Sequence, residues 1–260
     1  EEYAGNEFDK WLYLNYTVPY NIEVVYRWDA AQSYSSLSEV QLVPVEFDAV
    51  QPMMAALRDV WFKPYIQATG NSLDFLKEVA PKKIVLVGSP EYQNGTFKLG
   101  QAEGGRKILL LNVNNFDASN ENELKEALHT IVHEFTHILH QTKLFNQEYQ
   151  TISTGRYNSN WTLLNDSEAR HQGFITNYAM LNKDEDFAEM VSGILVFGYE
   201  WFKDTVLAEA AKSTENPHAK ADLEAKLAIV NSYFKETWNI EFFDNETSGE
   251  PGFESYFRMA

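Results

Sequence analysis

The sequence predicts an α+β fold, with a mixed β-sheet in an N-terminal lobe and helices in a C-terminal lobe. Runs typical of strands occur before residue 113, helical periodicity dominates after residue 165, and a long amphipathic helix stands between these regions. The 260 residues include 44% hydrophobic and 14% aromatic side chains, which can form one large core or two lobes of one core. The chain shows no repeat and no linker. We therefore expect a single domain, with an α/β lobe over residues 1–145 and a helical lobe over residues 146–260.

The sheet of the N-terminal lobe is expected to begin at residues 21–28, where Ile22, Val24 and Tyr26 alternate and share one side of a strand. Helices are predicted next, at residues 47–61 and 72–79, and a strand at 83–87 follows them. After the hairpin signal Asn94-Gly95, a strand at 96–99 is predicted to pair with the strand at 83–87. A further strand is predicted at 107–113, after Gly104-Gly105.

One long helix is predicted at residues 121–143. Its apolar residues recur at spacings of four and three, which is the period of a helix that packs one stripe on a core; they are Leu124, Leu128, Ile131, Phe135 and Ile138. Asn120 followed by Glu123 has the pattern of a capping box, so the helix has a defined start.

The region after this helix is expected to begin with a loop at residues 145–165, which contains Gly, Asn and Ser. The rest is predicted as helices. One of them should have Asn216 as its cap and Pro217 in its first turn.

Within the long helix, His133 and His137 enclose Glu134 in the pattern His-Glu-x-x-His. Four residues of a helix advance about 6 Å and turn about 40° past one full turn, so both imidazoles face the same way and can hold one ion. Both histidines lie off the apolar stripe. Glu134 can reach the open side of the metal and accept a proton from water. The pattern therefore predicts a catalytic zinc site rather than an ordinary amphipathic helix.

A catalytic zinc ion normally takes three protein ligands, so a third one must be found. The long metzincin pattern is excluded, because its glycine and its third histidine would stand where this chain has His140 and Lys143. Between His137 and residue 180, the acidic residues all lie in predicted loops or short helices; they are Glu148, Asp166 and Glu168.

The acidic segment at residues 184–190 offers stronger candidates, because it opens a long helix with apolar periodicity. Glu185 and Glu189 share one face of that helix. One of them can ligate zinc while the other accepts a hydrogen bond from a ligating histidine. Charge compensation at the helix N-terminus explains the first acidic residues of the segment but not Glu189. We favour Glu185 as the third ligand, with Glu189, Asp186 and Glu168 as alternatives.

This arrangement resembles a known class of enzyme. The pattern Glu-x-Phe-Ala-Glu, about fifty residues after the histidine pair and preceded by a tyrosine seven residues earlier, is similar to that of lethal-factor-like and Pro-Pro endopeptidase gluzincins. The resemblance implies a zincin-like fold. It also implies that Glu185 is the third zinc ligand, that Glu189 is the carboxylate behind the ligands, and that Tyr178 is an active-site tyrosine.

A second resemblance covers nearly the whole chain. The runs at residues 11–24, 103–117 and 173–180 are similar to zinc metallohydrolase lipoproteins associated with outer-membrane import. This resemblance implies a periplasmic or cell-surface protein that acts beside TonB-dependent transporters of SusC/SusD-type systems and their lipoprotein partners. It further implies a lipid-bearing cysteine upstream of residue 1.

In gluzincin-like enzymes an extended substrate commonly lies along an edge strand above the zinc. Residues 106–112 are the candidate for that edge, and an interior strand is the alternative. The cleft is expected between the two lobes. His129 and His140 are expected beside the zinc face without ligating the metal, and His171 and His218 carry no supporting pattern.

Composition excludes several other classes of function. The net charge of −17 argues against nucleic acid or an anionic membrane surface as a partner. We interpret this charge first as a source of solubility, and a preference for neutral or basic peptides is the alternative. The absence of cysteine excludes disulfides, cysteine ligands and thiol catalysis. No run approaches eighteen consecutive apolar residues, so we expect no transmembrane segment in this chain.

Two classes of function fit these observations. The first is a zinc peptidase in which Glu134 activates water for attack on a peptide carbonyl. The second is a noncatalytic component of an import complex that binds a peptide or a glycan and keeps a vestigial metal site. Because a binding protein would have no need of Glu134, we favour the peptidase.

Overall fold

The structure is a computed structural model, and it describes residues 5–27, 42–93, 96–98, 100–103 and 106–260. The chain forms two compact units. The first comprises residues 1–66 and 71–138, and the second comprises residues 67–70 and 139–260. Helix α6 (Glu121–Thr142) runs through the division, so its last turn belongs to the second unit.

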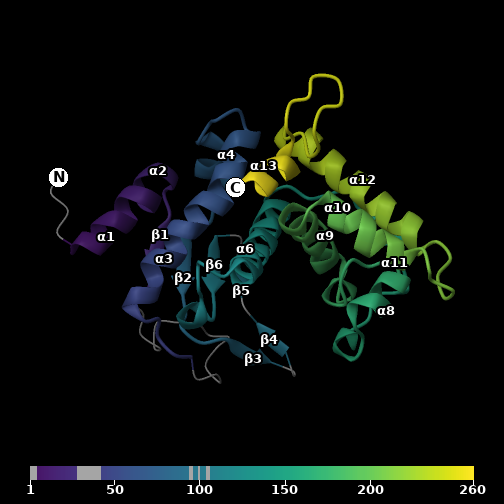
Figure 1. Cartoon of the computed structure of the whole chain (residues 1–260), viewed down its shortest axis with the longest axis horizontal. Coiled ribbons are helices and arrows are strands. Elements are labelled where there is room, and N and C mark those ends of the chain that lie inside the picture. Colours follow the sequence, from purple (N-terminus) through teal and green to yellow (C-terminus); the bar gives the residue numbers. More distant parts are fainter. Residues whose placement is uncertain (1–4, 28–41, 94–95, 99, 104–105) are drawn as a thin grey trace. The chain divides into compact units, whose positions relative to one another are not determined.

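The first unit contains a four-stranded mixed sheet with the order β1-β2-β6-β5 (Figure 1). Strands β1 (Glu23–Val25), β2 (Lys83–Leu86) and β6 (Lys107–Leu110) run parallel, and β5 (Gly100–Glu103) pairs antiparallel with β6. Side chains from β2, β6 and the residues after them form a buried cluster of Val85, Val87, Leu109 and Leu111. Such apolar runs suit strands that are covered on both faces.

The helices of the first unit are α1 (Glu7–Leu12), α2 (Val18–Tyr20), α3 (Phe47–Leu57), most of α4 (Lys63–Ala68), α5 (Asp74–Val79) and most of α6, with π-helical turns at Tyr13–Thr17 and Arg58–Phe62 and a 3₁₀ turn at Val113–Asn115. The predicted helices at 47–61 and 72–79 are confirmed, and the first continues beyond its predicted end through a π-helical turn into α4.

Strand pairing in this unit differs from two predictions. Strand β3 (Glu91–Gln93) pairs antiparallel with β4 (Thr96–Lys98) in a separate two-stranded sheet, whereas β2 pairs with β1 and β6, so the predicted pairing of 96–99 with 83–87 is wrong. The hairpin signal Asn94-Gly95 and the pair Gly104-Gly105 lie outside the described residues. The candidate edge at 106–112 is also wrong, because β6 lies between β2 and β5, and β1 and β5 form the edges.

The remaining strand predictions hold in part. The first strand is shorter than the predicted 21–28, since Asn21 adopts a left-handed conformation (φ 56°) at the end of α2. Residue 28 lies outside the described residues.

Helix α6 confirms the predicted long helix and nearly all of its apolar stripe. Leu128, Ile131, Phe135 and Ile138 are buried, and Leu124 is half-buried. The Phe135 ring meets the edges of Trp61 and Tyr65 at centroid distances of 5.5 and 5.0 Å. These aromatic contacts hold the middle of α6 against the helical segment formed by α3 and α4.

The start of α6 uses the predicted residues in a different way. The Asn120 side chain accepts a hydrogen bond from the backbone N–H of Asn122 at 3.1 Å. The Glu123 carboxylate accepts from the Asp117 N–H and from the Asn120 side chain, each at 2.8 Å, and not from the Asn120 backbone as a capping box requires. The chain therefore caps the helix through a wider turn.

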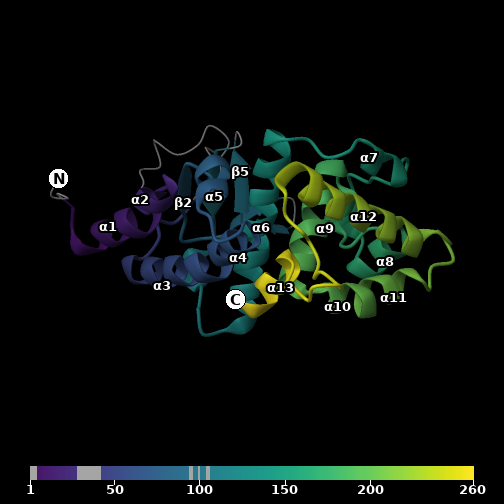
Figure 2. The same ribbon diagram turned by 90° about the horizontal axis from the view of Figure 1, so that it is seen from above.

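The second unit is helical, as predicted for the C-terminal region. Its elements are the last turn of α6, α7 (Glu148–Ile152), α8 (Asp166–His171), α9 (Lys183–Phe197), α10 (Tyr199–Trp201), α11 (Ala208–Ala210), α12 (Ala219–Trp238) and α13 (Phe253–Met259), with 3₁₀ turns at Trp161–Leu163 and Tyr178–Met180 and a π-helical turn at Phe202–Leu207. In both views of the ribbon, α8, α9, α11 and α12 gather in one bundle (Figures 1 and 2). Among the described helices, none has both the length and the apolar content that a membrane span needs.

Two local predictions in this unit need correction. The expected loop at 145–165 contains α7 and a 3₁₀ turn. Asn216 does not cap α12, because its side-chain oxygen accepts from the His218 N–H, and His218 is the residue that precedes the helix. Asn216 therefore closes a turn before the helix starts, and Pro217 lies within that turn.

The core of the second unit is centred on Phe187 of α9. Its ring stacks on Phe145 at 4.2 Å and meets the edges of Tyr149 and Tyr233 at 5.3 and 5.2 Å. The His140 ring, in the last turn of α6, lies 6.2 Å from the Phe187 ring. The C-terminal end of α6 therefore packs on the first turns of α9 within this unit.

Candidate metal centre

The two histidines of the His-Glu-x-x-His pattern face each other on α6. Their Nε2 atoms lie 3.1 Å apart, and their rings are inclined at 78°. Two ligands of one tetrahedral zinc ion, each about 2.0–2.1 Å from the metal, lie about 3.3 Å apart. The separation of His133 and His137 therefore fits a pair of nitrogen ligands to a single ion.

The helix around these histidines is firmly held. Between them, Phe135 points to the opposite face and is fully buried, and the Thr136 hydroxyl donates a hydrogen bond to the Val132 carbonyl at 2.7 Å. His133 itself is only 5% exposed. Because the turn is locked by packing on one side, the imidazoles on the other side keep a fixed spacing.

The first turn of α9 fixes the backbone of the third candidate ligand. The Asn182 side chain caps this helix by accepting hydrogen bonds from the N–H groups of Asp184 and Glu185, at 2.9 and 3.0 Å. The next residue, Asp186, is completely buried in an ion pair with Lys226 of α12. Glu185, held between this cap and this ion pair, is half-buried.

His133, His137 and Glu185 form a group that could hold a metal ion, since one ligand atom from each residue lies within 4.8 Å of the others. The contact between His140 and Phe187 is consistent with this grouping, because each of these residues is a near neighbour in sequence of one of the ligands. His140 continues the same helix less than one turn after His137, and Phe187 follows Glu185 by two residues. Two nitrogens and one carboxylate oxygen are a ligand set typical of catalytic zinc, with a position left for water.

Two further candidates lie in the second unit near the start of α9. One oxygen of the buried Glu189 carboxylate accepts a hydrogen bond from the Thr176 hydroxyl at 2.7 Å. Tyr178 opens a 3₁₀ turn, is half-buried, and meets the edge of the Trp161 ring at 4.9 Å. Glu134 lies on α6 between the two histidines and is half-buried.

The alternative ligands from the sequence have other partners. Asp186 pairs with Lys226, and one of its oxygens also accepts from the Tyr157 hydroxyl at 3.1 Å. Burial raises the pKa of the Asp186 carboxyl, and the charge of Lys226 opposes that rise. Glu168 forms the capping box of α8 with Asn165. Neither belongs to the group that could hold a metal.

The other acidic residues and histidines also lie elsewhere. Asp166 accepts from the Asn177 N–H, Glu148 opens α7, and the His171 ring lies 3.1 Å from the Glu209 carboxylate. His218 precedes α12.

Sequence reasoning missed three residues that support this region. Asn182 stands directly before an acidic first turn, which is an N-cap signal. Lys226 lies on the apolar face of α12 between Leu223 and Val230, where a lysine needs a buried partner. Thr176 gave no signal, because its bond to Glu189 depends on the tertiary fold.

Comparison with known proteins agrees with this chemistry. Residues 1–243 match the model of a family described as "Putative zinc-binding metallo-peptidase". A crystal structure of a protein from Bacteroides caccae ATCC 43185, with the same description, has 32% sequence identity and a TM-score of 0.74, and the match covers 97% of this chain and 90% of that one. A search of curated proteins finds no match. The family match spans far more than half of the sequence, and we conclude that the chain belongs to this family of zinc-binding metallopeptidases.

Proposed function

We propose that the protein is a zinc-dependent peptidase of the gluzincin type, in which His133, His137 and Glu185 hold the ion. The observation that carries this proposal is the grouping of these three side chains, two of which have the spacing of ligands to one metal. Family membership supports peptide substrates.

Zinc at this position supplies a Lewis acid, which polarises a carbonyl group and lowers the pKa of water toward about 7. The side chains of the protein carry out the other parts of the reaction. Glu134 lies next to His133 on α6, where its carboxylate takes the proton of the attacking water and delivers it to the leaving amine. This role requires a carboxylate, because an amide cannot accept that proton.

Tyr178 and Glu189 complete the proposed site. The Tyr178 hydroxyl donates a hydrogen bond to the carbonyl oxygen as negative charge develops on it, so it acts mainly in the transition state. Glu189, fixed by the Thr176 hydroxyl, accepts the free N–H of a ligating histidine and so sets the tautomer that binds metal.

Export of the protein is a further part of the proposal. The similarity of three sequence runs to import-associated lipoproteins supports a periplasmic or cell-surface location, a lipid anchor and a transporter partner. Fractionation of cells that express the complete gene product, followed by detection of the protein and of its transporter partner in the outer membrane, would test this part.

The experiment that tests the peptidase proposal compares the purified protein with Glu134→Gln. Metal analysis should give one zinc ion per chain for both proteins, and only the unaltered protein should cleave members of a diverse peptide library. A chelator should abolish cleavage, and added zinc should restore it. Normal turnover by Glu134→Gln would refute the assignment of the base. Tight binding of peptides by the zinc-loaded protein without any cleavage would favour the noncatalytic alternative.

A further inference from the structure

The first unit contains a cavity beside the candidate metal centre. It has a volume of about 250 Å³ and lies where the end of β6, the 3₁₀ turn at Val113–Asn115 and the N-terminal half of α6 meet. Its lining residues are Met53, Leu110, Leu111, Asn112, Asn115, Phe116, Glu123, Glu126, Ala127 and Thr130. This volume is below the usual range of about 300–1,000 Å³ for drug-sized ligands, so it suits a single side chain.

The cavity opens on the same face of α6 as the zinc-binding pattern. Each residue turns the helix by about 100°, so the three polar α6 residues in the lining point within the same arc of about 100° as His133, Glu134 and His137. Thr130 is about 4.5 Å along the helix axis from His133, and Glu126 is about 10 Å from it, at 1.5 Å per residue. The α6 residues of the cavity and the histidine pair therefore lie along one face of the same helix.

The lining residues have the chemistry to bind a long side chain that carries apolar methylene groups and a positive charge at its end. The side chains of Met53, Leu110 and Leu111 are buried and form its apolar part. Glu126 contributes a carboxylate that has no hydrogen bond or ion pair with any other described side chain, whereas the carboxylate of Glu123 is already held by the Asp117 N–H and the Asn120 side chain. A long basic side chain places its methylene groups on apolar surface and its charge on a carboxylate.

The polar atoms at the cavity favour the same ligand. The hydroxyl of Thr130, a lining residue, donates its proton to the Glu126 carbonyl at 2.9 Å, so its oxygen can only accept a hydrogen bond from a ligand. Two carboxylates repel an acidic side chain, and they leave the ammonium or guanidinium group of a basic residue with several acceptors. The net charge of −17 adds a long-range preference in the same direction.

We propose that this cavity is the subsite for a lysine or arginine side chain of the peptide substrate, adjacent to the bond that is cleaved. The inference rests on the proposed peptidase function for its link to the metal centre. The distances agree with it, because one residue of extended peptide spans about 3.5 Å and a lysine stem adds roughly 6 Å, which together reach Glu126 from His133. Glu126 is the residue that determines this specificity.

The test measures binding separately from turnover. Fluorescent peptides that differ only by lysine or norleucine at one position are titrated against zinc-loaded Glu134→Gln protein, so that cleavage cannot interfere. Norleucine keeps the apolar stem and lacks the charge. At one position the lysine peptide should bind about 5-fold more tightly than the norleucine peptide, as expected for a partly exposed ion pair. Adding Glu126→Gln should reduce the ratio of the lysine to the norleucine affinity to about 1. A third peptide, with glutamate at the same position, should bind the Glu126→Lys protein more tightly than the lysine peptide does.

Glu78→Gln is the matched control, because Glu78 is an exposed carboxylate on α5 of the same unit and does not line the cavity. It should keep the 5-fold ratio. A ratio near 1 in the parent protein at every position, or a ratio that Glu126→Gln leaves unchanged, would overturn the inference. Absence of cleavage by the unaltered zinc protein would instead count against the peptidase function, because the binding ratio does not depend on turnover.

Discussion

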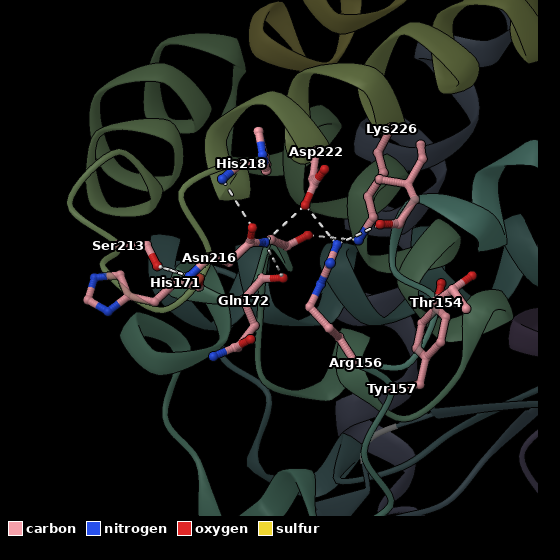
Figure 3. A network of polar contacts seen from close by, with 12 residues as sticks. Thr154, Arg156, Tyr157, His171, Gln172, Ser213, Asn216, His218, Asp222 and Lys226 are labelled. Atoms are coloured by element: carbon pink, nitrogen blue, oxygen red, sulfur yellow. Dashed lines mark hydrogen bonds and ion pairs between the residues drawn. The ribbon is translucent and has the colours of Figure 1, made fainter.

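Replacing Lys226 by methionine tests how the start of α9 is anchored. The Lys226 ammonium and the Asp186 carboxylate are both 0% exposed and lie 2.7 Å apart. The ammonium also donates to the Gly173 carbonyl at 2.8 Å and lies 4.1 Å from the centroid of the Phe174 ring. Figure 3 shows Lys226 in a network of polar contacts that also contains the ion pair of Asp222 and Arg156, whose charged atoms lie 2.7 Å apart.

The expected loss of stability follows from the carboxylate that remains. In Lys226→Met, Asp186 keeps the hydrogen bond from the Tyr157 hydroxyl at 3.1 Å but loses the cation that balances its charge. Removing one partner of a buried ion pair typically costs about 3–5 kcal/mol. Alternatively, Asp186 takes up a proton, and at pH 7 that costs about 4 kcal/mol, because each of the roughly 3 pH units above its ordinary pKa contributes about 1.36 kcal/mol. Both estimates give a loss of about 4 kcal/mol in the free energy of unfolding.

Urea unfolding at pH 7 and pH 5 measures this loss. In the variant, we expect the pKa of Asp186 in the folded protein to be higher than its pKa in the unfolded chain. The folded state is then most stable below the pKa of the unfolded chain, and it loses stability as pH rises through the pKa of the folded protein. The deficit should therefore shrink by more than half at pH 5. Lys220→Met, an exposed change on the same helix, is the control and should cost under about 1 kcal/mol. Equal losses for the two variants, or a deficit that is the same at both pH values, would refute the reasoning.

Three further predictions concern individual carboxylates and a tyrosine. Glu185→Ala should lower zinc affinity far more than Glu189→Ala, whose loss should be about 10- to 100-fold, and chelator competition will show whether the order is reversed. Tyr178→Phe should lower kcat on the order of 10²-fold with little change in KM or melting temperature, whereas a normal kcat would leave this ring with a packing role. Hydrogen bonds from Lys212 and Ser167 lower the pKa of Glu209 from 4.5 to about 2. The contribution of the Glu209 carboxylate to the stability of the fold is therefore present above pH 4.5 and is lost as pH falls toward 2. The melting-temperature difference between the unaltered protein and Glu209→Gln should shrink over that range, and a constant difference would contradict this account.

The helical elements and the zinc-binding pattern could be predicted because their signals are local. The i, i+4 spacing of His133 and His137 and the stripe through Phe135 depend only on the period of the helix, which backbone geometry fixes. The helix that follows Asp184 was predicted for the same reason, and the cap by Asn182 was available in the sequence as well. Zero cysteines and the net charge also limited the chemistry without any structure.

Strand pairing could not be predicted in the same way. The strand at Lys107–Leu110 carries an apolar run that suits an interior position, yet its neighbours are set by residues far away in the sequence, namely β2 on one side and β5 on the other. The strand at Thr96–Lys98 pairs with Glu91–Gln93 and not with the predicted strand at 83–87, a choice of partner that the local pattern did not indicate. Pairing of this kind depends on long-range contacts, which leave little trace in a local pattern.

By itself the sequence determined a zinc-binding helix, a helical second half, and a family of zinc-binding metallopeptidases, since helix period and ligand spacing are properties of neighbouring residues. Only the tertiary structure decided that Asp186 is used in a buried ion pair and that Glu126 faces a cavity beside the histidines. Adjacent carboxylates look alike in a sequence. Their roles separate when packing removes one from water and leaves another at an accessible surface, because burial makes an unpaired charge costly and forces the chain to supply a partner.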